Sequence, residues 1–367
     1  MKIGMLFSLS GPDAQTGQSI LDGALLAVSE VNDRGGVGGR PVEAVVVDDR
    51  SEVSALTRGV GELCETHAVD LVVGGYTSAS RVAMIPLIHQ FRSLLMYPTY
   101  FEGEENDSRV YYCGAAPNQY IADYLRWIAG HLGRRVYIVG SDYIYPRILT
   151  EAIRRLGAQL DIEIVASRFV PLGETRFGAI VADLSERQPD VVLCNLVGVH
   201  STSSFYQQFA AAGLTADRVP IAATVTTEID LAHMPTSISD GHYMVGTYFS
   251  ALDSPINAAY RGGLSAVRGQ RWAHPAQVGA YNAVHAACLA ADQIDLTGAD
   301  SLNAAMTGVR FDGNPEGAPF YFRSDHYSVH PSYLVQARDG AYVILEEFGT
   351  RVPEPWWSGS SPSAAIR

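Results

Sequence analysis

Lysine is almost absent from this chain of 367 residues: Lys2 is the only one, and every other basic side chain is arginine. A Schiff-base lysine and the lysine of a P-loop are therefore excluded. The basic residues are scattered and the formal net charge is −13. Because direct nucleic-acid binding normally needs a basic face, the composition argues against a nucleic-acid partner.

Cysteine is also scarce. The four cysteines, Cys64, Cys113, Cys194 and Cys288, are widely spaced and lie in apolar segments. This pattern favours buried free thiols over disulfides or a metal site. No apolar run approaches the length of a membrane span, and the N-terminus shows no signal-peptide pattern. We therefore expect a cytoplasmic protein, or a periplasmic or cell-surface one if a signal peptide has been removed.

Catalytic motifs are missing as well. There is no Gly-x-Ser-x-Gly elbow. His326 and His330 are four residues apart, but Pro331 favours a strand there, so we expect structural or solvated histidines and no metal site. The glycines of Gly35–Arg40 follow a helix and precede a strand, the reverse of a dinucleotide-binding fingerprint. The sequence therefore predicts no catalytic residue, no cofactor and no metal, and binding is the leading class of function.

Strands and helices alternate through the first two thirds of the chain. With 47% hydrophobic residues, the chain has enough apolar side chains for two cores. Alternation of this kind predicts an α/β protein with two doubly wound parallel sheets. The expected strands are Ile3–Phe7, Val42–Val47, Leu71–Val73, Leu94–Met96, Val136–Val139, Ile162–Val170, Val191–Asn195 and Ile221–Thr224. The main helices expected between them are Ser19–Asn32, Val53–Thr66, Ala79–Gln90, Tyr120–Leu132, Ile148–Leu156 and Phe177–Glu186.

Three stretches rich in hydroxyls and tyrosines follow the ends of expected strands, where a helix should begin: Gly74–Ser78, Tyr97–Gly103 and Gly140–Arg147. Ligands of open α/β sheets bind beyond the carboxyl ends of the strands. This composition predicts a pocket for a small, polar, uncharged molecule such as an amide. Glu228 follows the strand expected at Ile221–Thr224 and is the one charged side chain that could face the ligand. A ligand with an amino group therefore remains an alternative.

The chain resembles the type I periplasmic-binding proteins of the branched-chain amino acid and urea group. Within them it is most similar to the cytoplasmic amide sensors that control aliphatic amidase operons and to regulators of nitrile hydratase genes. The marks of this resemblance are Gly140–Arg147, Ala116–Gln119, Tyr97–Thr99 and Gly35–Pro41, and Tyr248–Ser250 also matches; the octapeptide Gly140–Arg147 is specific, whereas the glycine run at Gly35–Pro41 is shared more widely.

The resemblance implies a type I periplasmic-binding-protein fold, with two lobes, a hinge of three crossings and a ligand cleft between the lobes. The N-terminal lobe would comprise residues 1–116 and 251–325, and the C-terminal lobe residues 117–250 and 326–350. Residues 351–367 would form a surface tail.

The resemblance also implies the ligand-binding residues. They would be Tyr76, Ser78, Tyr97, Thr99, Tyr143 and Tyr145, with a hydroxyl from Thr226 or Thr227. Tyr100 stands where the amide sensors have proline, a departure that would alter the preferred ligand.

The expected function is therefore a non-enzymatic sensor of a short aliphatic amide or a similar neutral molecule. By the resemblance, it would regulate amidase or nitrile-metabolism genes through an antiterminator or response-regulator partner; a homo-oligomer is compatible with the sequence. The first alternative is the substrate-binding protein of an ABC transporter for urea, short-chain amides or amino acids. The second is an enzyme on the same scaffold.

Overall fold

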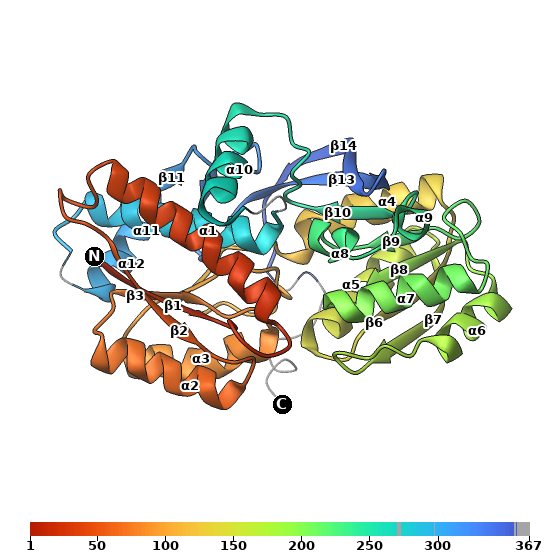
Figure 1. The fold of residues 1–367 in the computed structure, drawn as a ribbon, viewed down its shortest axis with the longest axis horizontal. Coiled ribbons are helices and arrows are strands. Elements are labelled where there is room, and N and C mark those ends of the chain that lie inside the picture. Colours follow the sequence, from red (N-terminus) through yellow and green to blue (C-terminus); the bar gives the residue numbers. More distant parts are fainter. Residues whose placement is uncertain (270–272, 297, 356, 358–367) are drawn as a thin grey trace. The chain divides into compact units, whose positions relative to one another are not determined.

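The computed structural model describes residues 1–269, 273–296, 298–355 and 357 (Figure 1). The chain divides into two compact units. Unit 1 comprises Met1–Phe101, Glu105–Ala116 and Asp253–His330, and unit 2 comprises Glu102–Glu104, Pro117–Leu252 and the chain from Pro331 onward. Apart from the short 102–104 segment, the chain passes between units after Ala116, Leu252 and His330. Each unit is built on its own sheet, which confirms the predicted α/β fold.

Unit 1 contains a five-stranded sheet in the order β2-β1-β3-β4-β5, with every neighbouring pair parallel. The inner strands consist almost entirely of buried apolar residues, as expected for a parallel sheet covered on both faces. The strands are β1 (Lys2–Phe7), β2 (Glu43–Asp48), β3 (Leu71–Gly74), β4 (Leu95–Tyr97) and β5 (Val110–Tyr112).

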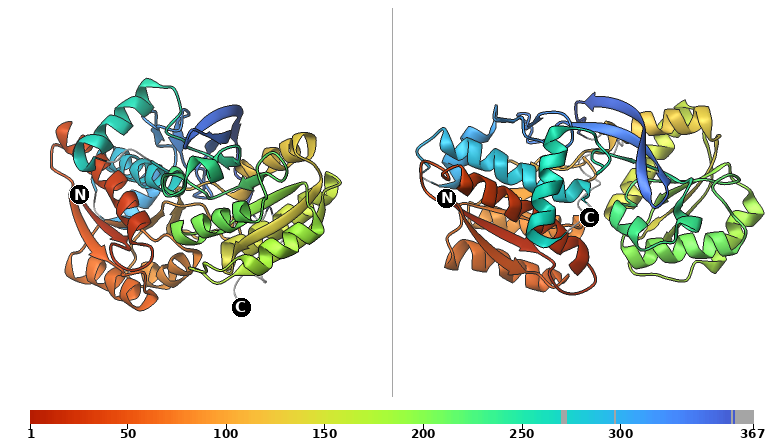
Figure 2. Two further views of the ribbon diagram at one scale, coloured as in Figure 1. Left: turned by 45° about the vertical axis from the view of Figure 1, so that its right-hand side comes forward. Right: turned by 45° about the horizontal axis from the view of Figure 1, so that its top comes forward.

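Helices cover both faces of this sheet. Helices α1 and α11 lie side by side on one face, and α2 and α3 lie on the other (Figures 1 and 2). Their apolar faces close a core that includes Leu6, Leu56, Val72, Met84 and Ile88. The helices are α1 (Ala14–Asp33), α2 (Val53–Gly61) with a π-helical extension (Glu62–Thr66), α3 (Ser78–Gln90), α10 (Pro255–Arg268), α11 (Pro275–Asp292) and α12 (Ala299–Met306). A small hairpin pairs β11 (Arg310–Phe311) with β12 (Phe320–Tyr321).

Unit 2 contains a seven-stranded sheet in the order β14-β13-β10-β9-β8-β6-β7. Strands β6 to β10 form its parallel part, and β13 joins β10 antiparallel. β13 and β14 are joined by Asp339-Gly340, both at positive φ, as a two-residue hairpin turn requires. The strands are β6 (Arg135–Ser141), β7 (Glu163–Val170), β8 (Val191–Asn195), β9 (Ile221–Ala223), β10 (Tyr243–Gly246), β13 (His330–Arg338) and β14 (Ala341–Arg351).

The core of unit 2 lies where α6 and α7 pack against this sheet. Phe177, Val181, Phe205 and Phe209 contribute aromatic and branched side chains to it, and Tyr137 joins them from β6. The helices are α4 (Ile121–His131), α5 (Ile144–Gln159), α6 (Gly178–Arg187), α7 (Val199–Ala211), α8 (Glu228–Ala232) and α9 (Thr236–Ser239), with a 3₁₀ turn at Pro117–Gln119.

Several elements differ from the sequence prediction. α1 begins at Ala14 rather than Ser19, and α5 at Ile144 rather than Ile148. Pro146 lies in the first turn of α5, where the missing N–H costs nothing, so it does not delay the helix. The short strands β5 and β10 were not predicted, although β3, β4 and β9 are equally short and were; tyrosines in β5 and a tyrosine and a glycine in β10 interrupt the apolar run that marked the other three.

The C-terminal segment differs too. β14 continues to Arg351, so the strand reaches the start of the predicted surface tail. Beyond it, the Val352 carbonyl accepts a hydrogen bond from Asn118 Nδ2 at 2.8 Å, and Glu354 N–H donates to Asn118 Oδ1 at 2.9 Å. These contacts attach the beginning of the tail to unit 2, whereas residues 358–367 lie outside the described residues.

Candidate functional site

Each sheet has a point where the chain connections leave in opposite directions, and such points favour ligand binding in open α/β sheets. In unit 1 it lies between β1 and β3, and in unit 2 between β6 and β8. All ten predicted ligand-binding residues follow or end strands at the carboxyl edges of these sheets. Tyr76, Ser78, Tyr97, Thr99 and Tyr100 belong to unit 1, and Tyr143, Tyr145, Thr226, Thr227 and Glu228 belong to unit 2.

In unit 1, the β3–α3 connection and the end of β4 meet. The hydroxyl of Tyr97 donates to the Tyr76 carbonyl at 2.8 Å, so one predicted ligand contact positions the backbone of another. Ser78 is buried and is the first residue of α3, whose first turn carries N–H groups without intrahelical partners. Thr77 caps this helix, with its Oγ1 accepting from Ser80 N–H at 3.2 Å. Thr99 and Tyr100 follow β4 and are half-buried.

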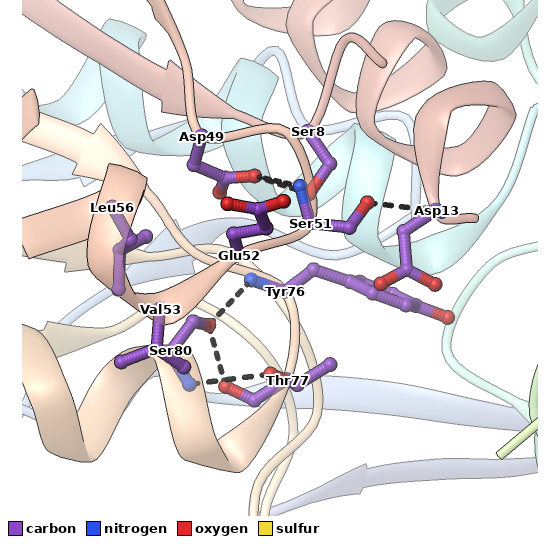
Figure 3. A pocket seen from close by; sticks show the side chains of 10 residues that line it. All are labelled: Ser8, Asp13, Asp49, Ser51, Glu52, Val53, Leu56, Tyr76, Thr77 and Ser80. Atoms are coloured by element: carbon purple, nitrogen blue, oxygen red, sulfur yellow. Dashed lines mark hydrogen bonds between the residues drawn. The ribbon is translucent and has the colours of Figure 1, made fainter. Parts of the chain in front are cut away.

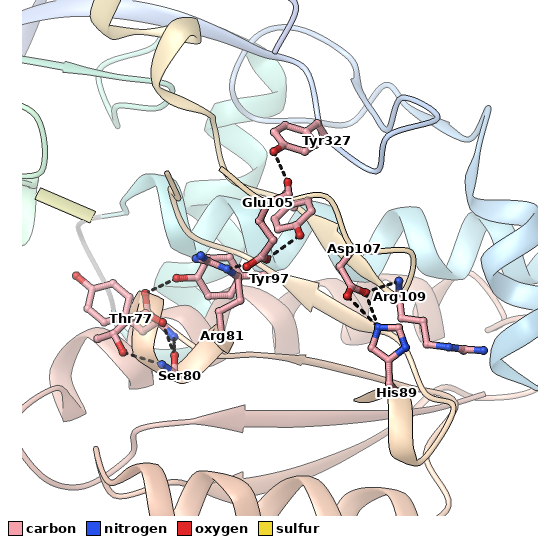
Figure 4. A network of polar contacts seen from close by, with 11 residues as sticks. Thr77, Ser80, Arg81, His89, Tyr97, Glu105, Asp107, Arg109 and Tyr327 are labelled. Carbon is pink, nitrogen blue, oxygen red and sulfur yellow. Dashed lines mark hydrogen bonds and ion pairs between the residues drawn. The ribbon is translucent and has the colours of Figure 1, made fainter. Parts of the chain in front are cut away.

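A network of polar contacts around Arg81 holds the β3–α3 connection in place (Figure 4). Arg81 on α3 is buried; its Nε donates to Glu105 Oε1 at 3.1 Å, and its guanidinium lies 5.0 Å from the centre of the Tyr97 ring. Tyr112 donates to the same Glu105 oxygen at 2.7 Å. The network therefore fixes Tyr97 and, through it, the backbone at Tyr76. Sequence reasoning missed Arg81, because its partner lies 24 residues away in the chain.

An open pocket of about 320 Å³, counting the solvent at its mouth, lies at the carboxyl ends of β1, β2 and β3 (Figure 3). Its wall carries three carboxyl groups. Burial, and then the charge of Asp49, raise the pKa of Asp13, and burial raises the pKa of Asp49 despite its hydrogen bonds from Ser8 and Ser51. Of the predicted residues, only Tyr76 lines it. The lining residues are Ser8, Asp13, Asp49, Ser51, Glu52, Val53, Leu56, Tyr76, Thr77 and Ser80.

The tyrosines of unit 2 stand at the start of α5. Tyr143 precedes the helix and is half-buried, and its ring centre lies 6.5 Å from that of Tyr145. Tyr145 is buried, and its hydroxyl shares a short hydrogen bond with the hydroxyl of Tyr120. Tyr145 thus has a structural contact inside its own unit, which the sequence pattern did not reveal.

The segment after β9 supplies the remaining predicted residues. The carbonyl of Thr226 accepts from Tyr342 at 2.8 Å, and Thr227 donates through both its N–H and its hydroxyl to Asp230, at 2.6 and 2.9 Å. Burial raises the pKa of Asp230 to about 6, although these bonds oppose the shift. Thr227 is therefore a helix-capping residue, a role that its position before α8 could have indicated.

Glu228 is buried, with 5% of the residue exposed. Its Oε1 accepts from the backbone N–H of Ser250 at 2.9 Å, and its Oε2 accepts from the Ser250 hydroxyl. Two donors on one residue therefore hold the carboxylate in a fixed orientation.

A row of polar side chains joins the neighbouring strand ends of unit 2. Val197 N–H donates to Ser141 Oγ at 3.0 Å, and Thr224 Oγ1 donates to Asn195 Oδ1 at 2.6 Å. The strand-end rule that led to Tyr143 could also have selected Asn195, which closes β8 at the switch point.

Within residues 1–269, 273–296, 298–355 and 357, no group of three or more His, Cys, Asp or Glu side chains could hold a metal ion. All four cysteines are free; Cys64 is half-buried and the other three are buried. In the same described part of the chain, no helix is both long and apolar enough to cross a membrane.

The sequence profile of the periplasmic binding protein domain family matches residues 1–362, and the chain belongs to this family. It is 26% identical over 327 residues to a Leu/Ile/Val-binding protein homolog of Brucella melitensis, covering 85% of this chain and 83% of that protein. It is 28% identical over 201 residues to Leu/Ile/Val-binding protein BraC3 of Rhizobium johnstonii; this match covers 52% of the chain and only 53% of that relative.

Solved structures of solute-binding proteins share the fold. An ABC-transporter solute-binding protein from R. palustris in complex with benzoate superposes with a TM-score of 0.83 at 22% identity, over 96% of this chain and 97% of that one. A branched-chain amino acid transporter substrate-binding protein from Streptococcus pneumoniae in complex with isoleucine gives 0.84 at 20% identity, over 95% and 99%. At these identities the likeness establishes the two-lobe fold.

These comparisons correct part of the sequence interpretation. The relatives and structures named above are binding proteins, which is consistent with the absence of an enzymatic role. They give no support to the amidase operon, the regulator partner or the cytoplasmic location. Most of the motifs that suggested an amide sensor lie at strand ends, where ligands of open α/β sheets bind in general, so their position alone does not separate regulators from transport receptors.

Proposed function

We propose that this protein is the solute-binding component of an ABC transporter and binds a small solute that carries N–H donors, namely an amino acid, a short-chain amide or urea. The family and the Leu/Ile/Val-binding relatives support this role over gene regulation. Such a receptor works outside the cytoplasmic membrane, so the proposal favours a periplasmic or cell-surface location.

The buried carboxylate of Glu228 is the main support for a ligand with N–H donors. A carboxylate that is 5% exposed and oriented by Ser250 is an acceptor for an ammonium or amide N–H of the ligand. A ligand ammonium paired with a buried carboxylate is well stabilised, because an unpaired buried ion costs several kcal/mol.

The oxygen end of the ligand requires donors, and unit 1 supplies them. We propose that the Ser78 hydroxyl and the N–H groups in the first turn of α3 bind the carbonyl or carboxylate oxygen, with Thr99 as a second hydroxyl. Tyr76 and Tyr143 complete the lining. A solute that engages these groups stabilises the bound form of the protein through its higher affinity for that form.

A thermal-shift screen of the full chain tests the proposal. The panel comprises branched-chain amino acids, short amides, urea and, as a contrasting class without N–H donors, benzoate. We expect at least one N–H-bearing solute to stabilise the protein, by about 2.7 kcal/mol at 100 times its Kd. Stabilisation by benzoate alone would contradict the ligand class, since a second anion cannot pair with Glu228.

A regulatory role is the second candidate, favoured by one observation, the octapeptide Gly140–Arg147. In that role the protein would bind an amide and then release or recruit a transcription regulator. Ligand-dependent capture of a purified antiterminator by the protein would favour this role.

A further inference from the structure

The pocket at the carboxyl ends of β1, β2 and β3 holds carboxyl groups that the proposed function does not use. All of its lining residues belong to unit 1 (Figure 3). Asp13, Asp49 and Glu52 line it, and the described residues of its wall include no lysine or arginine. The pocket therefore gathers negative charge without a basic side chain in its wall.

The fold uses a fourth carboxylate of this region, that of Asp48, for a structural purpose. Its Oδ1 accepts from the N–H groups of Leu9 and Arg50, both at 2.8 Å, and its Oδ2 accepts from the Ser10 hydroxyl at 2.7 Å. These bonds tie the segment after β1 to the segment after β2. Asp48 is accordingly absent from the lining of the pocket, and the walls that it connects are fixed.

Asp49 is used only in part. The residue is 5% exposed, and its Oδ1 accepts from the Ser8 hydroxyl at 2.5 Å and from Ser51 N–H at 2.9 Å. Its Oδ2 accepts no hydrogen bond from any residue that the structure describes. The carboxyl group points into the pocket (Figure 3). A buried carboxylate oxygen without a donor is unfavourable, so a donor from a bound molecule would stabilise it.

Asp13 and Glu52 are not used by the fold through their side chains. Asp13 precedes α1 without capping it, although its N–H donates to Ser51 Oγ at 3.1 Å and so fixes its place. Neither carboxylate forms a hydrogen bond or an ion pair within the described part of the chain, and the exposed Arg50 forms no ion pair there. Burial raises the pKa of both Asp13 and Asp49, as expected for carboxyl groups without a nearby cation.

We propose that this pocket binds an organic cation through an ammonium or guanidinium group, which donates N–H bonds to Asp49 Oδ2 and to the Asp13 carboxylate. Glu52 adds a third negative charge, and the Tyr76 ring, which also lines the pocket, attracts cations through its face. Charge-assisted hydrogen bonds of this kind are stronger than those between neutral groups.

An organic cation suits the pocket better than a metal ion. Among the residues that the structure describes, no three His, Cys, Asp or Glu side chains are placed to hold a metal. A guanidinium or ammonium group brings several N–H donors that point in different directions, so it can reach carboxylates that stand apart.

Two sources offer the same group: a free cation, and the cationic end of a solute bound at the neighbouring Tyr76 and Ser78. The second source rests on the proposed function, whereas the first holds for any solute.

The first test is an NMR titration of the full chain with methylguanidinium, and with N-methylurea as its neutral counterpart. We expect saturable shifts of the Ser8, Asp13 and Ser51 amides with methylguanidinium and none with N-methylurea. Asp13→Asn keeps the shape of the side chain and should raise Kd roughly tenfold. Asp217→Asn, the control, removes an exposed charge of unit 2 and should leave Kd unchanged.

The second test compares L-arginine with its neutral counterpart L-citrulline and separates the two sources. A Kd for L-arginine well below that of methylguanidinium and of L-citrulline, with the advantage lost in Asp13→Asn, assigns the pocket to the end of a solute. Equal Kd values for L-arginine and methylguanidinium assign it to a free cation. If Asp13→Asn does not fold, Glu52→Gln, at an exposed position, replaces it.

The proposal is overturned if neither methylguanidinium nor L-arginine gives a saturable shift at the pocket, or if the neutral counterparts bind as tightly as the cations. Binding of neutral amino acids, amides or urea alongside that result would leave the proposed function standing. Binding of methylguanidinium without any binding of those solutes would support the cation site and contradict the proposed function.

Discussion

Replacing Glu228 with glutamine removes one charge from the proposed recognition surface and changes little else. Glutamine has the same shape, and its carbonyl oxygen can still accept from Ser250 N–H, the bond of 2.9 Å that orients the side chain. The Ser250 hydroxyl can accept from the new amide. We therefore expect the fold and the free energy of unfolding to change by less than about 1 kcal/mol.

The effect on binding depends on the ligand class. If a ligand ammonium faces Glu228, the substitution leaves that ammonium without its buried charged partner. The binding free energy then falls by about 3–5 kcal/mol, which raises Kd roughly 100- to 4,000-fold. If a neutral amide N–H faces it, the loss is about 1 kcal/mol, or roughly fivefold. Glu228→Gln thus separates amino acids from amides and urea.

Isothermal titration calorimetry on the wild type, Glu228→Gln and Ser250→Ala measures Kd for the amino acids, the amides and urea. Ser250→Ala is the matched control, since it keeps the carboxylate charge and removes the hydroxyl donor alone. We expect its Kd to rise tenfold or less. An unchanged Kd in Glu228→Gln for every solute that the wild type binds would refute the role of Glu228 and move the N–H end of the ligand to another group.

Three further predictions concern stability and reactivity. Arg81→Met should destabilise unit 1 by about 3 kcal/mol in urea unfolding, the low end for a broken buried pair because Glu105 is 23% exposed; a change under 0.5 kcal/mol would show that the pair is not structural. Burial lowers the pKa of His242 from 6.5 to about 4, with its Nδ1 accepting from Ile221 N–H at 3.0 Å, so its contribution is complete above pH 6.5 and lost as pH falls towards 4. The stability difference between the wild type and His242→Asn should therefore shrink by up to about 3 kcal/mol over that range, and a difference independent of pH would contradict the assignment. In the native protein, thiol titration should find at most Cys64 reactive, because burial raises the pKa of all four thiols, that of Cys194 to about 12; rapid reaction of two or more thiols would contradict their burial.

The sequence predicted the fold well because alternating strands and helices leave a periodic signal that does not depend on distant contacts. Apolar runs such as Leu71–Val73 identified the inner parallel strands. The same rule failed for β5 and β10, in which tyrosine and glycine residues interrupt the apolar run.

Individual roles at the site were less predictable. Strand ends indicated where Tyr97 and Tyr145 stand, but their hydroxyls bond to Tyr76 and Tyr120, partners at 21 and 25 residues' separation that no local pattern marks. Asp49 was missed although it directly follows β2, because attention went to hydroxyls and aromatic rings rather than to carboxylates. His330 was expected to be structural or solvated, and its contact with Glu316 depends on tertiary packing alone.

The central claim, that the protein is a receptor for a small N–H-bearing solute, is tested most directly by calorimetric titration of the full chain with L-valine, L-leucine, propionamide and urea. The account predicts saturable binding of at least one of them at one molecule per chain. No saturable heat from any of the four, in a protein whose cooperative thermal unfolding shows that it is folded, would contradict it.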